Sequence, residues 1–249
     1  MDSARIVTKR RLLVIGAMLG LTAASLVVGV AVVLLLSATV VLGVGLELSN
    51  TGALILSLIG IQGIAFPTVG YVYLRYHGRA VLEFVPTRVP SLRDVGVIVG
   101  GWIGALGALL VVANLVLAVS DTAPAQNQAA QTVAENPEFV PFLLPFVFLL
   151  NGPGEEFLYR GVIQGRFRED FSAPAAIVLA TLMFAPIHIF SFVEASPQAA
   201  LLTISLLTVP SLVFGAVYEY TDNFVVPALV HGLYNATLFG GIYLSNVVG

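Results

Sequence analysis

The chain has 249 residues, of which 58% are hydrophobic and only 10% carry a charge. Soluble domains carry roughly 25% charged residues, because their surfaces must be hydrated. Together with a mean hydropathy of +0.97, this composition argues against a soluble enzyme or a nucleic-acid-binding protein. It predicts an all-α protein, a polytopic bundle of transmembrane helices. The absence of cysteine excludes disulfide bonds, thiolate metal ligands and a cysteine nucleophile.

Charge-free runs mark the expected membrane spans, because about 20 apolar residues at a rise of 1.5 Å per residue cross the hydrocarbon core. We expect about seven spans, within a range of roughly six to eight, and we interpret the long first run as one span. The runs are Leu12–Leu46, Leu48–Leu74, Val95–Ser120, Phe139–Gly154, Phe171–Val193, Ala195–Tyr218 and Asn223–Gly249.

The basic residues predict the orientation, because Lys and Arg are retained on the cytoplasmic side of short loops. All 11 fall within residues 5–11, 75–93 and 160–168, which share one side of the membrane in this topology. The predicted outer loops hold acidic residues and no basic one, namely Glu47, Asp121, Glu135, Glu138 and Glu194. We therefore expect a multi-pass protein of the cell membrane with a cytoplasmic N-terminus, in contact with the lipid bilayer and without a nucleic-acid partner.

The chain divides into three parts. Residues 1–120 hold spans one to three, residues 121–138 form a polar outer loop with room for a short helix, and residues 139–249 hold spans four to seven. The connector between spans two and three contains Pro86 and Pro90. We expect this connector to be cytoplasmic, with a short interfacial helix.

Ionisable residues fall inside two of the last four spans and directly after the charge-free run of a third, and a charge near the middle of the bilayer costs at least about 2.5–3.5 kcal/mol. A charge inside a span is therefore a functional hypothesis by default. In chain order these residues and their close neighbours are Glu155, Glu156 and Arg160 after the predicted helix breaker Asn151-Gly152-Pro153, then His188 one turn after Phe184, then His231 with Asn235. Pro186 is expected to disturb the helix around His188.

Helical spacing predicts what these groups can contact. Glu156 and Arg160 are four residues apart, so they share a helix face and can form an ion pair. Glu155 is rotated by about 100° from Glu156, so we expect it to point elsewhere and to remain the less compensated carboxylate. At 1.5 Å per residue the depths of the three sites overlap. One buried cluster is therefore expected, formed by Glu155, His188, His231 and Asn235 and braced by Glu156 and Arg160.

These residues resemble the CAAX protease and bacteriocin-processing family of intramembrane proteases, which includes the type II CAAX prenyl endopeptidases. The family pattern is Glu-Glu-x-x-x-Arg, then Phe-x-x-x-His, then His-x-x-x-Asn or Asp, on successive C-terminal spans. All three motifs occur here in that order, within roughly residues 139–246. Each motif alone is weak, because four-residue spacings arise by chance, but three in order are specific.

The resemblance implies an intramembrane endopeptidase that hydrolyses a peptide bond with an activated water. Its substrate would be a peptide or protein, either prenylated or membrane-embedded. The implied site residues are Glu155 as general base with His188 for the water, His231 and Asn235 for the oxyanion, and Glu156 and Arg160 as supporting residues.

Metal participation stays open at this point. Glu155, His188 and His231 are suitable zinc ligands, and bound zinc lowers the pKa of its water toward about 7. However, the sequence contains no His-Glu-x-x-His motif, and the family has been described both as metalloproteases and as glutamate proteases. A divalent metal and a metal-free site therefore remain alternatives.

Two other classes of protein compete with a protease. One is an ion- or proton-coupled transporter in which the intramembrane Glu and His residues carry protons, although no inverted repeat is evident. The other is a non-catalytic membrane scaffold or immunity protein of the same fold. Each motif also has a simpler explanation, since a lone intramembrane His more often packs than reacts. Neither alternative cleaves peptides, so both predict no difference in peptide cleavage between wild type and Glu155→Ala.

Overall fold

The computed structural model describes residues 2–192 and 195–247. Within those ranges the chain is helical and contains no strand, which confirms the all-α prediction. Two predicted span ends, Val193 and Gly249, and the predicted outer-loop residue Glu194 lie outside the described residues.

The N-terminal part forms three long helical spans. The first is α1 (Asp2–Ala38) with the π-helical turn η1 (Thr39–Val44), the second is α2 (Asn50–Ser57), η2 (Leu58–Ala65) and α3 (Phe66–Tyr76), and the third is α5 (Leu92–Leu117). The short helix α4 (Val81–Phe84) lies in the connector where one was expected. The first run is one helix, which ends where Gly45 takes a left-handed backbone with φ of 77°.

The C-terminal part forms the remaining helices. After α6 (Gln128–Glu135), span four joins η3 (Pro137–Phe139), α7 (Val140–Phe146), η4 (Val147–Asn151), α8 (Gly152–Glu156), η5 (Phe157–Gln164) and α9 (Gly165–Arg168). It is followed by α10 (Ala173–Phe184), η6 (Ala185–Ser191), α11 (Pro197–Thr221) and α12 (Val225–Val247).

Six helices in the described part of the chain are long and apolar enough to cross a membrane. In addition, α6 and the helix Pro137–Arg168 pass the same test as a pair, with a bend of 106° between them. The total is therefore six or seven spans, within the expected range. The protein is a multi-pass membrane protein.

The segment Asn151-Gly152-Pro153 does not break span four, contrary to the sequence prediction. The helix continues through it, and η4 widens to a π-helical turn directly before α8. Pro153 lacks a backbone N–H, and a locally widened turn accommodates its ring without ending the helix. Pro186 has the expected effect, since α10 ends at Phe184 and continues as a 3₁₀ helix.

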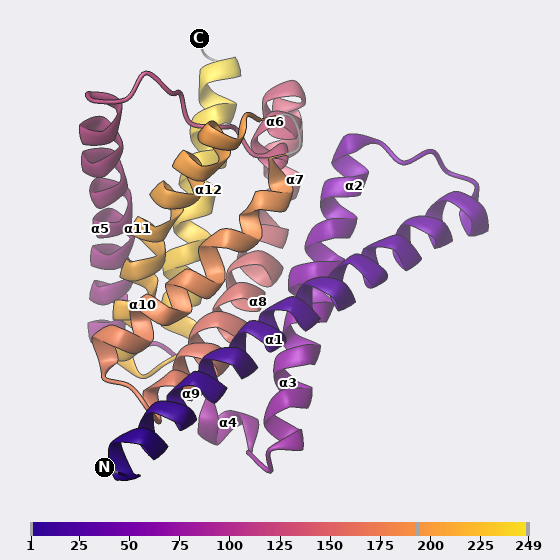
Figure 1. Cartoon of the computed structure of the whole chain (residues 1–249). Helices are drawn as coiled ribbons and strands as arrows, with labels where there is room; N and C mark the ends of the chain where they lie inside the picture. Colours follow the sequence, from indigo (N-terminus) through magenta and orange to yellow (C-terminus); the bar gives the residue numbers. More distant parts are fainter. Residues whose placement is uncertain (1, 193–194, 248–249) are drawn as a thin grey trace.

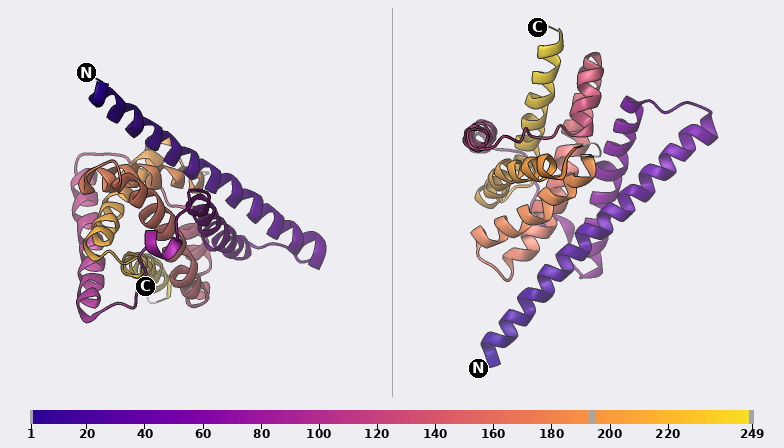
Figure 2. Two further views of the ribbon diagram at one scale, coloured as in Figure 1. Left: turned by 90° about the horizontal axis from the view of Figure 1, so that it is seen from below. Right: turned by 45° about the horizontal axis from the view of Figure 1, so that its top comes forward.

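The spans surround span four. In Figure 1, α5 lies at the left edge and α2 and α3 lie at the right, with α7, α8 and α10 to α12 between them, while α1 runs diagonally from the lower left to the upper right. Figure 2 shows α1 as a straight rod along one side of the bundle, with both ends extending beyond it. The start of α1 and the end of α12 lie at opposite ends of the molecule (Figure 1). This arrangement fits an odd number of spans.

Ion pairs gather the three basic segments at one end of the bundle. Arg10 of α1 and Arg166 of span four both pair with Asp170, and Arg79 of the connector pairs with Glu169. The structure thus places on one side the three segments that the sequence assigned to one side. The cytoplasmic position of that side remains a prediction.

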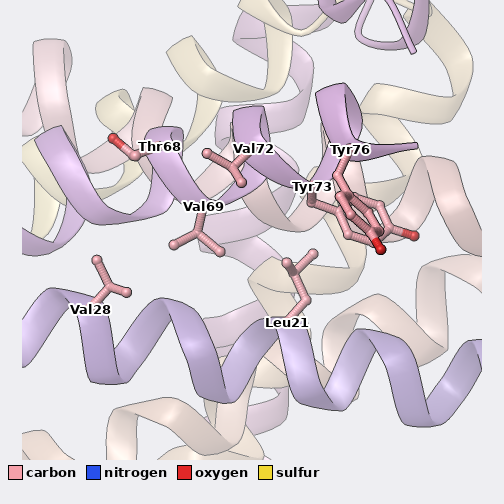
Figure 3. A pocket seen from close by; sticks show the side chains of 7 residues that line it. All are labelled: Leu21, Val28, Thr68, Val69, Val72, Tyr73 and Tyr76. Atoms are coloured by element: carbon pink, nitrogen blue, oxygen red, sulfur yellow. The ribbon is translucent and has the colours of Figure 1, made fainter. Parts of the chain in front are cut away.

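An apolar groove of about 420 Å³ lies between α1 and α3 (Figure 3). It is lined by Leu21 and Val28 of α1 and by Thr68, Val69, Val72, Tyr73 and Tyr76 of α3. None of these side chains belongs to the three motifs. The groove is therefore separate from the candidate site described next.

Candidate active site

The two glutamates of the first motif end α8 and are both buried. Glycines let neighbouring helices approach α8 from two sides. A Cβ on Gly152 would lie 2.7 Å from the carbonyl oxygen of Ala228 in α12, and a Cβ on Gly154 would collide with the carbonyl oxygen of Gln62 in η2. The absence of these two side chains brings α12 and η2 into reach of the glutamates.

His231 of α12 lies between the two carboxylates. Its Nδ1 is 2.9 Å from Glu156 Oε1, and its Nε2 is 3.7 Å from Glu155 Oε2. A carboxylate only accepts hydrogen bonds, so Nδ1 carries the proton in the contact with Glu156. The ring stacks on Phe214 at 4.6 Å between centroids, which holds its plane. One imidazole therefore connects both glutamates.

Glu155 and Glu156 have different neighbours, but both contact His231. The rotation of about 100° between adjacent helical residues does separate the two side chains. However, an imidazole carries nitrogens on two sides of its ring, so a single histidine can contact both carboxylates.

Glu156 is held by a buried chain of polar contacts that links three spans. Arg160 Nε lies 3.1 Å from Glu156 Oε2, and both side chains are 0% exposed. The Arg160 Nη2 atom donates to Ser211 Oγ at 3.1 Å, and the Ser211 hydroxyl donates to Thr181 Oγ1 at 3.0 Å. The positive charge beside Glu156 offsets the cost of burying its carboxylate. We call Glu156, Arg160, Ser211 and Thr181 the charged arm.

Glu155 is held by neutral amides. Gln62 Nε2 and Asn151 Nδ2 donate to the same oxygen, Glu155 Oε1, at 3.2 and 3.1 Å. Asn235 Nδ2 donates to Asn151 Oδ1 at 2.6 Å, so the third motif reaches Glu155 through Asn151. We call Gln62, Asn151 and Asn235 the amide arm. Glu155 is therefore less compensated by charge than Glu156, as expected, but it is well hydrogen-bonded.

His188 contacts Phe184 rather than hydrogen-bonding to the glutamates, within the part of the chain that the structure describes. Its Nδ1 is 3.3 Å from the carbonyl oxygen of Phe184, and its ring is 4.9 Å from the Phe184 ring. The Phe184 ring in turn lies 6.1 Å from the ring of His231. Within the described ranges, no hydrogen bond or ion pair joins His188 to Glu155 or His231. The structure thus links Glu155 to His231 and, through Asn151, to Asn235, while His188 contacts Phe184, whose ring also contacts that of His231.

The residues present do not fit the zinc site that the sequence left open. Zinc needs several nitrogen and oxygen ligands at about 2.0–2.2 Å from one point. Among the described residues, no three His, Asp or Glu side chains converge in this way. Both nitrogens of His231 face carboxylates, and His188 forms no hydrogen bond or ion pair with either carboxylate among the described residues. No step of the reaction is therefore derived through a metal.

Four residues of the two arms were not singled out for the site from the sequence. Gln62 and Asn151 are uncharged amides in otherwise apolar runs, and Ser211 and Thr181 are small hydroxyl residues that occur in many transmembrane helices. A search for ionisable residues passes over all four. A search for amides inside charge-free runs would have found the first two.

Comparison with known proteins supports the resemblance. Residues 137–237 match the model of a family described as type II CAAX prenyl endopeptidase Rce1-like. No curated protein and no solved structure matched the chain. The matched segment covers fewer than half of the residues, but it contains all three motifs. At the level of the family the match supports an intramembrane protease of the CAAX type. It confirms, over residues 137–237, the similarity to type II CAAX prenyl endopeptidases that the motifs indicate.

Proposed function

We propose that this chain is an intramembrane endopeptidase of the CAAX-processing type that hydrolyses a peptide bond with a water activated by Glu155. One observation carries the proposal: Glu155 and Glu156 contact the two nitrogens of one buried imidazole, His231, within the matched segment. Hydrolysis requires a base for the water and donors for the oxyanion, shielded from lipid. Both kinds of group are present here.

The proposed reaction begins when Glu155 accepts a proton from the attacking water. The water oxygen bonds to the carbonyl carbon of the substrate and forms a tetrahedral intermediate. The C–N bond then breaks, and the proton held by Glu155 passes to the leaving nitrogen. One water is consumed and Glu155 returns to its carboxylate form, so the cycle closes without a covalent intermediate.

The developing oxyanion needs donors, and two are available. The Nε2 atom of His231 is not engaged by Glu156. An imidazole donates from both ring nitrogens only when both carry a proton, and in that form Nε2 is the nitrogen available to the oxyanion. Asn235 Nδ2 carries two hydrogens, of which one is used on Asn151. We assign both residues to the oxyanion, and we retain His188 from the second motif as an aid to the water.

The proposed substrate is a peptide or protein that reaches the site from the bilayer. A prenylated C-terminus is the first class to test, because the matched family is described as a prenyl endopeptidase. The many exposed apolar side chains of α1 and α5 are consistent with a lipid environment around the bundle.

The experiment is cleavage of a quenched fluorescent CAAX lipopeptide, and of a panel of transmembrane peptides, by purified protein. Wild type is compared with Glu155→Ala and with Glu138→Ala, which removes an exposed carboxylate from the same span. We expect cleavage by wild type and Glu138→Ala, none by Glu155→Ala, and no loss when a chelator is added. Cleavage that survives Glu155→Ala, or no cleavage by folded wild type, would contradict the proposal.

A further inference from the structure

Gln62 places an uncharged amide among the apolar side chains of span two. Its Nε2 donates to Glu155 Oε1 at 3.2 Å, although 93 positions separate the two residues in the sequence. A carboxamide within a membrane span is costly unless it is hydrogen-bonded. Its hydrogen bond ties it to the one residue that the proposed reaction uses as its base.

Close helix packing brings Gln62 to this position. A Cβ on Gly60 would lie 2.7 Å from the Val33 side chain of α1, and Gly154 of α8 leaves room for the Gln62 backbone on the other side. The segment η2 thus fits tightly between α1 and span four. It is also a π-helical turn, a geometry that occurs frequently at functional sites.

Glu155 determines the orientation of the Gln62 amide. A carboxylate oxygen only accepts, so the NH₂ group must face it and Oε1 must point away. This Oε1 atom is buried and has no hydrogen-bond partner among the described residues. A buried acceptor without a donor is destabilising, and such atoms are commonly satisfied by a bound water.

We infer that Gln62 is a positioning residue of the hydrolysis proposed above, on which this inference rests. Its Nε2 holds Glu155, and its Oε1 accepts a hydrogen bond from the attacking water. The water then has one O–H directed at Gln62 and the other available to Glu155. Since Gln62 and Asn151 both bind Oε1 of Glu155, the other oxygen accepts no hydrogen bond from the described residues and lies 3.7 Å from His231 Nε2, so it can take the proton.

This inference extends the active site beyond the matched segment, because Gln62 belongs to the N-terminal spans and residues 137–237 do not include it. Residues 1–120 then contribute chemistry as well as membrane anchoring. Span two closes the site from the side opposite α12.

The chain contains a matched control in Gln164. Its side chain is buried, its Nε2 donates to the Gly215 carbonyl oxygen at 3.1 Å, and its Oε1 also lacks a partner. The two glutamines therefore share amide chemistry, one donated bond and one unpartnered oxygen. They differ in that only Gln62 bonds to Glu155, so the contact with Glu155 distinguishes a positioning role from a structural one.

The experiment measures kcat, KM and the thermal unfolding midpoint for Gln62→Met and Gln164→Met on the lipopeptide that wild type cleaves. Losing one hydrogen bond to a charged group corresponds to about a 10- to 100-fold effect. We expect Gln62→Met to lower kcat by about that factor with KM changed less than about twofold. Gln164→Met should keep kcat within about threefold of wild type. Its thermal unfolding midpoint should shift by about as much as that of Gln62→Met.

Gln62→Glu and Gln62→Asn provide a second test if Gln62→Met does not fold. Gln62→Glu keeps the volume but removes the donor, so kcat should fall at least as far as expected for Gln62→Met. Gln62→Asn keeps the amide on a shorter side chain and should retain more activity than Gln62→Glu. Equal kcat values for the variants of Gln62 and Gln164→Met, with wild type active and Glu155→Ala inactive, would overturn this inference and leave the proposed function standing. No turnover by wild type would overturn both.

Discussion

The two arms of the site hold two adjacent glutamates in different ways. The charged arm neutralises Glu156 with Arg160 and extends through Ser211 into α10 and α11. The amide arm binds Glu155 with neutral donors from η4 and η2 and leaves one carboxylate oxygen without a hydrogen bond. A carboxylate neutralised by a buried cation is suited to orienting a partner, whereas one held by amides can still accept a proton. Adjacent identical residues thus acquire separate tasks.

The largest effect should come from Glu155→Gln, which changes the chemistry with little change in contacts. The new amide oxygen can still accept from Gln62 and Asn151, so the fold should be retained. A glutamine cannot act as a base, and general base catalysis contributes about 10²- to 10⁴-fold. We expect kcat to fall by at least about 10²-fold, measured with the cleavage assay. A variant that keeps a tenth or more of wild-type kcat would contradict the assignment of the base.

Arg160→Met tests the charged arm through stability. It leaves the Glu156 carboxylate buried with only His231 beside it, and breaking a buried ion pair costs about 3–5 kcal/mol. We expect a marked fall in the thermal unfolding midpoint in detergent. Arg168 lies in the same span as Arg160, and Arg168→Met removes its half-exposed ion pair with Glu219 of α11, which should cost less than about 1 kcal/mol. Similar midpoints for the two variants would argue against a stabilising role for the charged arm.

His188→Ala tests the second motif against a matched control. His77 makes the same local contacts, since its Nδ1 is 2.8 Å from the carbonyl oxygen of Tyr73 and its ring is 4.4 Å from the Tyr73 ring. We expect His188→Ala to lower kcat by about 10²-fold, a typical effect for a group that assists proton transfer. His77→Ala should be neutral. Equal activities would remove His188 from the proposed site.

Asn151→Ala tests the amide arm. It removes one donor to Glu155 and the acceptor for Asn235, so kcat should fall by about 10- to 100-fold. Asn114→Ala is the control, because its amide bonds only to the carbonyl oxygen of Leu110 in its own helix, among the contacts of the described residues. If both variants keep wild-type kcat, the amide arm does not position Glu155.

Ser211→Ala should have the smallest effect. It removes the hydroxyl that accepts from Arg160 Nη2 and donates to Thr181. A buried hydrogen bond of this kind is worth about 1–3 kcal/mol, which thermal unfolding can detect. The ion pair with Glu156 remains, so kcat should change less than about threefold. A larger loss of kcat would place Ser211 nearer to the reaction than the charged arm implies.

The sequence predicted the features that depend on hydropathy and on spacing along one helix. The spans follow from charge-free runs, and the contact between Glu156 and Arg160 follows from a separation of four residues. The sequence did not reveal that His231 lies between the two glutamates. That placement depends on which helices neighbour α8, and Gly152 and Gly154 decide this by steric contact rather than by chemistry.

The amide arm was not predicted from the sequence, for a different reason. Gln62 and Asn151 carry no charge, so they do not interrupt an apolar run in the way that a glutamate does. Their role becomes visible only when the contact with Glu155 is known. The helix break predicted at Pro153 was wrong for a similar reason. The widened turn that accommodates Pro153 has no signal in local composition.

The most direct test of the separate tasks of Glu155 and Glu156 is to measure the unfolding midpoint and the cleavage rate of Glu155→Gln and Glu156→Gln side by side. Glu155→Gln should unfold like wild type and fail to cleave. Glu156→Gln should unfold at a clearly lower temperature, because Arg160 is then buried without its counter-charge. If the two variants have the same midpoint, or if Glu155→Gln cleaves as fast as wild type, the two glutamates do not have the separate tasks that their contacts indicate.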